Sequence, residues 1–586
     1  MVFHSKDRLL LRAVIGAILL LGVLQVSDSA NISYDWHVAF NTTLKPASVQ
    51  QPVIAINGMF PGPLINATTN DYVHVNVFND LDEPLLFTWN GIQQRLNSWQ
   101  DGVSGTNCAI QPGKNWTYVF EVKDQIGSFF YFPTTNFQKA GGGFGPIRVN
   151  NRVVISVPFA KPEADFDLLI GDCTPDKILM NGKYSYLDPE AGNGYESFTV
   201  TQGKTYRFRI VNVGSQWSFN FRIQGHKMLV VETEGSYTSQ VEVDSLDVHV
   251  GQSYSALVSA TQQTGAFYIV ASAKMATEDE LNNLTVVGVL LYSGSAANPT
   301  GQLPSGPDPF DVQFSINQAW NIKLNMTTGA ARPNPQGSFN VWNVTLSQTF
   351  ILRGSSADIN GTPRYTVNNV SNMIPDTPLK LADYYSNGSG VYELDKFSTN
   401  SSNPEVVNGV FVATGYHKGW IEIIFQNDLD GIDTWHLDGF GFFVVGFGTG
   451  TWTPESRFTY NLKDPVVRST TQVYPGGWTA VYAYLDNPGM WNLRSQILKN
   501  WFLGEELYVR VYDADPNPAK ELPPPDNIIL CGKYAPAPSP ADPPPPSPVD
   551  PPSPSPVDPP APSPKKSLAT SKELACLLIL LFYCFS

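Results

Sequence analysis

One strand pattern occurs three times along the chain and constrains its fold more than any other feature. Apolar residues that alternate or run continuously lead to an asparagine within 71–80, 203–214 and 419–428. Each copy follows an asparagine-containing turn and precedes a strand that begins Gly-x-aromatic. Strands of this length, bounded by Gly, Pro and Asn, are typical of Greek-key β-sandwiches. The sequence therefore predicts an all-β protein with three tandem sandwich domains, at 31–155, 156–335 and 336–535.

The composition agrees with a multidomain extracellular protein. The chain has 586 residues, which is more than one hydrophobic core usually organises. Aromatic residues make up 12% of it and charged residues only 15%. Its net charge of −15 argues against a nucleic-acid partner, because phosphates would be repelled. The same charge disfavours direct binding to an acidic polysaccharide unless a divalent cation bridges the two.

The start of the chain has the layout of a secretory signal peptide. Residues 1–30 combine a basic beginning, an apolar run at 13–26 and small residues before the expected cleavage point. A membrane-spanning helix is the alternative, but roughly 14 apolar residues are too few to cross a bilayer comfortably. We therefore predict that residues 1–30 are removed during secretion.

The end of the chain predicts a lipid anchor. Residues 536–567 form a Pro/Ser-rich stalk, expected to be an extended polyproline segment, and 568–586 end in an apolar tail. That order is typical of a GPI signal whose tail is removed, with Ser567 or Ser563 as the attachment residue. A transmembrane anchor is the alternative, although about 12 apolar residues are short for one. We expect a secreted protein that reaches the membrane only through its GPI lipid.

Cysteines and glycosylation sequons fit this compartment. Only Cys108, Cys173 and Cys531 lie outside the removed tail, and one disulfide is expected among them. We predict that Cys108 and Cys531 pair, tying the last segment to the first domain, and that Cys173 is free and buried. Ten sequons predict a heavily glycosylated surface, at Asn41, Asn66, Asn115, Asn283, Asn325, Asn343, Asn360, Asn369, Asn387 and Asn400.

Six motifs spread over nearly the whole secreted chain carry a family resemblance. They are NGMFPGP (57–63), WNGIQQR (89–95), DGVSGTNCAIQPG (101–113), GSFFYFPTTNFQKAGGGFGPI (127–147), HLDGFGFFVVG (436–446) and DNPGMW (486–491). Together with the three sandwiches they resemble the multicopper oxidases, such as plant ascorbate oxidase and laccase, whose three domains are cupredoxin-like. That family reduces dioxygen at a trinuclear copper cluster with electrons taken from substrate at a blue copper.

The resemblance implies eleven principal copper ligands, ten His and one Cys, and this chain matches only one of them, His436. Blue copper requires a soft thiolate and imidazoles, and a serine hydroxyl or an arginine cannot replace them. We therefore expect no cofactor and no catalytic residues, with copper as the alternative. The other positions hold Thr88, Asn90, Phe132, Thr134, Asp433, Asp438, Arg494, Ser495, Gln496 and Asn500, and Glu505 stands where the family has an axial Met.

These replacements resemble those of the plant skewed and skewed-similar proteins, also called monocopper oxidase-like proteins. That resemblance implies a role in directional cell expansion and wall organisation, at the outer face of the plasma membrane and in the cell wall. Cell-wall components or cell-surface proteins would be the partners. Such a protein would be structural or interacting rather than enzymatic.

Two other functions stay open on the sequence alone. In the first, His436 with Asp438 and Asp433 holds one residual copper and the protein is an oxidoreductase; in the simpler interpretation, His436 is only hydrogen-bonded. In the second, tryptophans form a platform for cell-wall polysaccharide. The candidates are Trp36, Trp89, Trp99, Trp217, Trp320, Trp342, Trp435, Trp452, Trp478 and Trp501.

The residues at two of the implied copper-ligand positions predict one contact. Asp438 and Arg494 stand at positions whose family counterparts both face the trinuclear cluster. Without metal cations there, a buried carboxylate requires another positive charge, which an arginine supplies. We predict that Asp438 and Arg494 form an ion pair.

Overall fold

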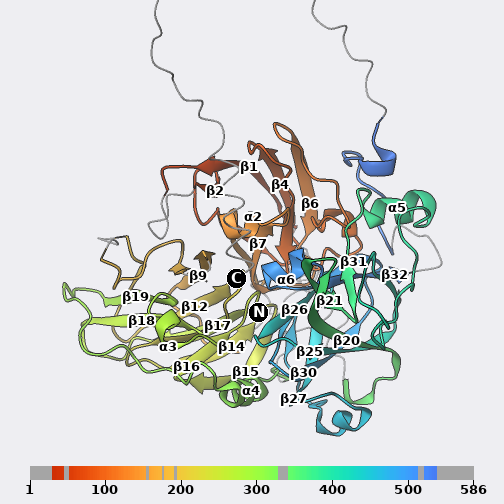
Figure 1. The fold of residues 1–586 in the computed structure, drawn as a ribbon. Coiled ribbons are helices and arrows are strands. Elements are labelled where there is room, and N and C mark those ends of the chain that lie inside the picture. Colours follow the sequence, from red (N-terminus) through yellow and green to blue (C-terminus); the bar gives the residue numbers. More distant parts are fainter. Residues whose placement is uncertain are drawn as a thin grey trace, which may run out of the picture.

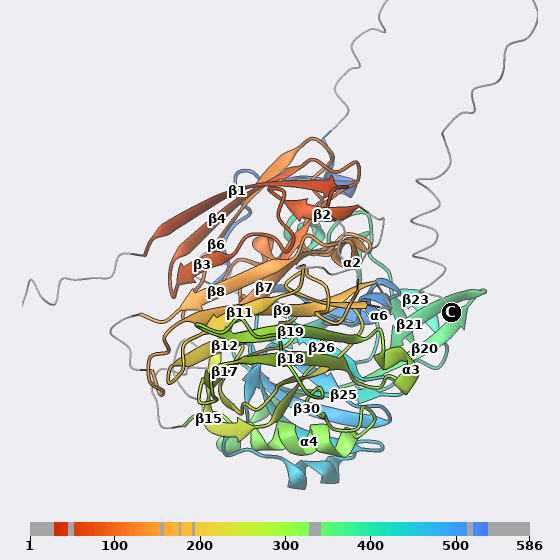
Figure 2. The ribbon, with the colours of Figure 1, turned by 90° about the vertical axis from the view of Figure 1, so that its left-hand side faces the viewer.

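The repeated strands form the centre of three β-sandwiches, as the computed structural model shows (Figures 1 and 2). It describes residues 29–44, 52–152, 157–174, 177–189, 194–326, 341–512 and 520–536. The prediction of an all-β, three-domain chain is confirmed. In Figure 1 the first domain, in red and orange, lies above the second and the third.

The first domain packs two four-stranded sheets against each other. Its core contains Trp36, Trp89, Tyr118 and Tyr131, whose rings contact one another. One sheet has the order β2(Val53–Ile56), β1(Asn31–Asn41), β4(Tyr72–Asn79) and β6(Asn115–Glu121). The other has the order β3(Ile65–Thr68), β8(Gly145–Asn150), β7(Gly127–Pro133) and β5(Phe87–Asn90).

The second domain pairs a six-stranded with a five-stranded sheet. The first has the order β10(Lys177–Met180), β9(Asp165–Thr174), β12(Thr205–Asn212), β17(Ser253–Ser259), β14(Met228–Thr233) and β15(Ser236–Val243). The second has the order β11(Ser197–Val200), β19(Thr285–Tyr292), β18(Ala266–Ala273), β13(Phe219–Ile223) and β16(Ser245–Val248).

The third domain pairs an eight-stranded with a five-stranded sheet. The larger has the order β23(Val407–Gly409), β22(Val370–Asn372), β21(Thr362–Val367), β20(Leu346–Ile359), β25(Trp420–Asn427), β30(Gly477–Tyr484), β27(Phe442–Thr449) and β28(Val467–Arg468). The smaller has the order β24(Val412–Tyr416), β32(Glu506–Tyr512), β31(Gly489–Ser495), β26(Asp433–Leu437) and β29(Thr470–Val473).

Helices are short and lie outside the sheets. The α-helices are α2(Gln138–Gly141), α3(Glu278–Leu281), α4(Val312–Asn321), α5(Leu379–Ser386) and α6(Leu498–Phe502). The 3-10 helices are η2(Ser98–Gln100), η3(Val341–Asn343), η4(Pro454–Thr459) and η5(Gly532–Tyr534). Within the described ranges, no helix is both long and apolar enough to cross a bilayer.

The asparagine that ends each repeated strand closes the same turn in all three domains. Asn79, Asn212 and Asn427 are at most 1% exposed. In each, Oδ1 accepts the backbone N–H two residues later, at 2.8–3.1 Å, and Nδ2 donates to two backbone carbonyls. An amide can satisfy three buried backbone groups at once because it carries both donors and an acceptor.

A second asparagine stabilises the turn that precedes each repeated strand. Asn57, Asn181 and Asn368 have φ of 51°, 49° and 52°, a left-handed conformation that asparagine tolerates. Each donates its side-chain amide to one backbone carbonyl of the first strand of its domain and accepts a backbone N–H of that strand. That strand runs parallel to the repeated one, as β1 does to β4. The turn therefore sets the register of the first pair.

The last described segment returns to the first domain. Cys531 forms a disulfide with Cys108, with the Cα atoms 5.9 Å apart. Nearby, the indole N–H groups of Trp99 and Trp116 donate to the carbonyls of Leu522 and Asn527. The first and third domains are thus joined across the chain.

Several predicted features lie outside the described residues, and the use of the glycosylation sequons stays a prediction. Residues 1–28 of the predicted signal peptide, the stalk and tail from 537 onward with Ser563 and Ser567, and the side chain of Cys173 are outside them. The asparagines of all ten predicted sequons are exposed or half-exposed. A further sequon, Asn31-Ile32-Ser33, lies in β1 with an exposed asparagine.

Removing the disulfide should loosen the return of the last segment. We expect the Cys108→Ser/Cys531→Ser variant to lose about 2–5 kcal/mol in the free energy of unfolding, because the unfolded chain is no longer constrained. Chemical denaturation measures the loss, and limited proteolysis should cut first in 520–536. A variant as stable as the wild type under oxidising conditions would contradict this.

Candidate functional site

The positions that the resemblance assigns to the trinuclear cluster meet between the first and third domains. β5 pairs with β7, which places Thr88 opposite Phe132. β26 pairs with β31, which places His436 opposite Arg494. Each of the eight positions is at most 9% exposed: Thr88, Asn90, Phe132, Thr134, His436, Asp438, Arg494 and Gln496. The fold thus brings these residues into one buried region.

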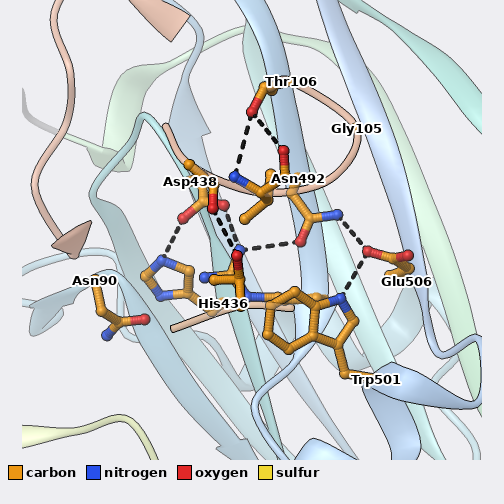
Figure 3. Close-up of polar contacts among 12 residues, drawn as sticks. Asn90, Gly105, Thr106, His436, Asp438, Asn492, Trp501 and Glu506 are labelled. Carbon is orange, nitrogen blue, oxygen red and sulfur yellow. Dashed lines mark hydrogen bonds and ion pairs between the residues drawn. The ribbon is translucent and has the colours of Figure 1, made fainter. Parts of the chain in front are cut away.

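A histidine, an aspartate and an arginine form the centre of this region (Figure 3). Asp438 accepts from Arg494 Nη1 through one oxygen, and its other oxygen lies 2.9 Å from Nε2 of His436. The Nδ1 atom of His436 lies 2.8 Å from the hydroxyl of Thr470. Asp438 and Arg494, which we expected to pair, are therefore in direct contact, and both ring nitrogens of His436 are occupied.

The charges of this centre balance each other. Burial alone would raise the pKa of Asp438, but Arg494 and His436 outweigh it, so this pKa lies below its usual value. Burial lowers the pKa of His436 despite its bond to Asp438. The arrangement is therefore an arginine–carboxylate pair beside a neutral imidazole.

Aromatic and polar neighbours hold the arginine in place. The Arg494 guanidinium carbon lies 4.6 Å from the centroid of the Trp501 ring, and Nη1 also donates to Asn492 at 3.0 Å. Both Trp501 and Asn492 donate to Glu506, at 2.8 and 2.6 Å. Among the described residues, Nε and Nη2 of Arg494 have no hydrogen-bond partner. The guanidinium is therefore positioned by one carboxylate, one amide and one aromatic face.

The remaining positions are filled by neutral groups. The amide of Gln496 donates to Asn90 at 2.6 Å, which links the third domain to the first. The hydroxyl of Thr134 donates to the carbonyl of Gly102 at 2.7 Å. Phe132 stacks on Phe130, with ring centroids 5.4 Å apart. These contacts are those of a packed interior.

Two ionisable residues of this region were not singled out by the sequence analysis. Lys139 of α2 is 2% exposed, its Nζ lies 4.5 Å from the centroid of Phe132, and burial lowers its pKa to about 7. Asp101 is 3% exposed, and burial and then the charge of Asp438 raise its pKa well above the usual value. The only signal in the sequence was their place inside two of the family motifs, DGVSGTNCAIQPG and NFQKAGGG.

The positions assigned to the blue copper form a separate buried group. Ser495 donates to Oδ1 of Asp433 at 2.6 Å, and its oxygen accepts from the backbone N–H of Ile497. Asp433 therefore lies with Ser495 and Glu505 rather than with His436, so it is not available to the residual copper site considered above. Burial raises the pKa of Asp433 to about 6, and burial together with the charge of Asp433 raises that of Glu505 well above its usual value.

Neither group fits copper. A copper centre of this family requires imidazole and thiolate donors. The central region offers one imidazole whose two nitrogens are already bonded, and the second region offers only oxygen and amide donors. In the part of the chain that the structure describes, no three His, Cys, Asp or Glu side chains are grouped to hold a metal ion.

The other histidines lie away from this region. His37 contacts Asp80, His74 contacts Asn31, His226 contacts Tyr292 and His249 contacts Ser218. Each of these contacts is an ordinary hydrogen bond or ion pair within one domain.

Family comparisons agree with the architecture. Three multicopper oxidase domain families match residues 38–153, 157–295 and 376–517. This chain belongs to the multicopper oxidase family. Among solved structures, it superimposes on Fet3p, described as a multicopper oxidase that functions in iron import, with a TM-score of 0.67 at 20% identity, covering 82% of this chain and 90% of that one. The laccase from Botrytis aclada gives 0.67 at 23%, covering 82% and 88%.

Within the family, similar sequences come from plants. The chain is 48% identical to the monocopper oxidase-like protein SKU5 of Arabidopsis thaliana, over 85% of this chain and 89% of that protein. It is 43% identical to an L-ascorbate oxidase homolog of Brassica napus, over 87% and 94%. It is 30% identical to the L-ascorbate oxidase of Cucurbita pepo var. melopepo, over 80% and 93%. The resemblance to monocopper oxidase-like proteins is thereby confirmed.

The central ion pair should be costly to break from one side. In Arg494→Met, Asp438 stays buried without its cation, and we expect a loss of about 3–5 kcal/mol in the free energy of unfolding. The double variant Asp438→Asn/Arg494→Met should lose less than the two single variants summed, because no charge is stranded. Urea denaturation of the four proteins measures the coupling. Additive losses would contradict a direct pair.

Lys139 should make stability depend on pH. The unfolded chain keeps the lysine proton up to about pH 10.4, whereas the folded chain releases it near pH 7, so the unfolded state binds more protons between these values. The penalty for burying Lys139 is therefore full below pH 7 and shrinks as pH rises. We expect Lys139→Met to gain about 1–3 kcal/mol at pH 6 and less at pH 9.5, by chemical denaturation. Exposed Lys463→Met is the control, and an equal gain at both pH values would contradict this.

Proposed function

We propose that this protein is a GPI-anchored, glycosylated member of the multicopper oxidase family without a functional copper electron-transfer chain. It acts as a structural or interaction protein at the surface and in the wall of plant cells. There it contributes to directional expansion and wall organisation through partners among cell-wall components or cell-surface proteins.

One observation supports the proposal that the copper electron-transfer chain is not functional. At the positions of the family's trinuclear cluster, Arg494, Asp438 and His436 bond to one another instead of converging on an open centre. Arg494 keeps a permanent positive charge beside the only imidazole of this region, and that charge would repel a copper ion. The hydroxyl of Ser495 and the carboxyl of Asp433, bonded to each other, likewise supply no thiolate or imidazole.

Support for the setting comes from the sequence and from relatives. The predicted signal peptide, stalk and GPI tail favour the outer face of the plasma membrane. Similar proteins of Arabidopsis thaliana bear the name monocopper oxidase-like. The alternative of a tryptophan platform for polysaccharide is not favoured, because seven of the ten tryptophans considered for it are at most 9% exposed: Trp36, Trp89, Trp99, Trp435, Trp452, Trp478 and Trp501.

Elemental analysis distinguishes this proposal from a residual copper oxidoreductase. We expect the purified, secreted chain ending at residue 536 to contain copper far below one atom per chain after dialysis against copper, because its donors are already bonded to each other. Stoichiometric copper that is lost in His436→Ala and retained in the control His226→Ala would overturn the proposal. Inductively coupled plasma mass spectrometry makes the measurement.

A further inference from the structure

The four residues at the blue-copper positions form a buried set of hard oxygen donors. Asp433 belongs to β26 and Ser495 to β31, Asn500 lies in α6, and Glu505 directly precedes β32. Asp433 and Asn500 are 2% and 6% exposed, and Ser495 and Glu505 are 0% exposed. Buried carboxyl groups are costly unless they are paired or bind a metal.

Three carboxyl oxygens of this group are unsatisfied. Oδ1 of Asp433 accepts from Ser495 and from the backbone N–H of Thr434. By contrast, Oδ2 of Asp433 and both Oε atoms of Glu505 lack a hydrogen-bond partner anywhere in the described chain. The backbone carbonyl of Glu505 accepts from the N–H of Ser495 at 3.0 Å, and the Ser495 hydroxyl donates to Asp433, so both acidic residues adjoin the same serine. Burial and then the charge of Asp433 raise the pKa of Glu505. The side chain of Asn500 lowers this pKa, but by less than burial and Asp433 raise it.

The backbone is shaped around Glu505. A Cβ atom at Gly354 would lie 2.2 Å from Oε1 of Glu505. A glycine in β20 therefore makes room for the carboxyl group, and any larger residue there would force it aside. The unpaired carboxyl is accordingly a feature that the fold accommodates.

The group is reached from a cavity between the second and third domains. Its volume is about 710 Å³, and Asp433 and Asn500 are among the residues that line it. Asp428, Asp430 and Glu280 also line it, so the approach carries acidic groups that raise the local concentration of cations. Two lysines also line it: Lys274, which is paired with Asp247 at 3.2 Å, and Lys499 of α6.

We propose that Asp433 and Glu505, with the side-chain oxygen of Asn500, bind a hard divalent cation, calcium, that enters from this cavity. Calcium takes six to eight oxygen ligands in flexible geometry, so carboxylates, an amide oxygen and water from the cavity suit it. The same donors are poor ligands for copper. A cation here would neutralise both carboxylates and remove the repulsion between them. This proposal does not rest on the proposed function.

Calcium binding can be tested on the secreted chain after treatment with a chelator, at pH 7.5. At a hundredfold excess over its Kd, calcium should raise the melting temperature by about 5–10 °C above that of the apo protein, and the rise should continue with the logarithm of the calcium concentration. Terbium should bind competitively at one ion per chain, with luminescence sensitised by Tyr365. That tyrosine lines the cavity, and burial followed by the charges of Glu505 and Asp433 raises its pKa, which places it beside the site.

Variants of single carboxyl groups test whether Glu505 and Asp433 are the calcium ligands. Glu505→Gln and Asp433→Asn should lose at least tenfold in calcium affinity, and each apo variant should be no less stable than the wild type because an uncompensated charge is removed. Glu506→Gln makes the same change one residue along, where Asn372, Asn492 and Trp501 already bond the carboxyl, and it should keep the calcium response. The proposal would be overturned if the melting temperature of the wild type did not change up to about 10 mM calcium, a concentration above the Kd of the weakest extracellular sites. An unchanged response in Glu505→Gln would also overturn it.

Discussion

The structure depends on keeping electrical balance in the buried region between the first and third domains. Eight side chains from two sheets converge there, and each is at most 9% exposed. An isolated charge in such a place costs several kcal/mol. The pair of Asp438 with Arg494 meets this constraint, and the bond of His436 to Asp438 adds an imidazole that stays neutral.

That pair then organises its neighbours. Arg494 lies against the Trp501 ring and donates to Asn492. The indole N–H of Trp501 and the side-chain amide of Asn492 then need a buried acceptor. The carboxyl group of Glu506 accepts from both. On the opposite side, the bond from Gln496 to Asn90 joins the two domains. The region between the first and third domains is thus held by hydrogen bonds and one buried ion pair.

The three domains and the central ion pair could be predicted from the sequence, because short sequence motifs indicate both. The asparagines at 79, 212 and 427 recur because each closes the same turn, so the repeat itself revealed three domains. The ion pair could be expected because the family resemblance assigned both residues to ligand positions of one cluster. Lys139 and Asp101 escaped notice because a charged residue in a loop motif is ordinarily solvated. Only tertiary packing buries them, because α2 lies against β9 of the second domain and η2 lies against β31 of the third.

The two buried polar regions differ in how their carboxyl groups are compensated. In the first, Asp438 pairs with Arg494, and its pKa lies below the usual value. In the second, Asp433 and Glu505 form no ion pair with any described residue, although a serine and an asparagine lie beside them. Apolar side chains would fill such a region at lower cost, since they leave no polar atom unsatisfied. Two buried acids next to an acidic cavity are therefore better explained by a cation that they bind.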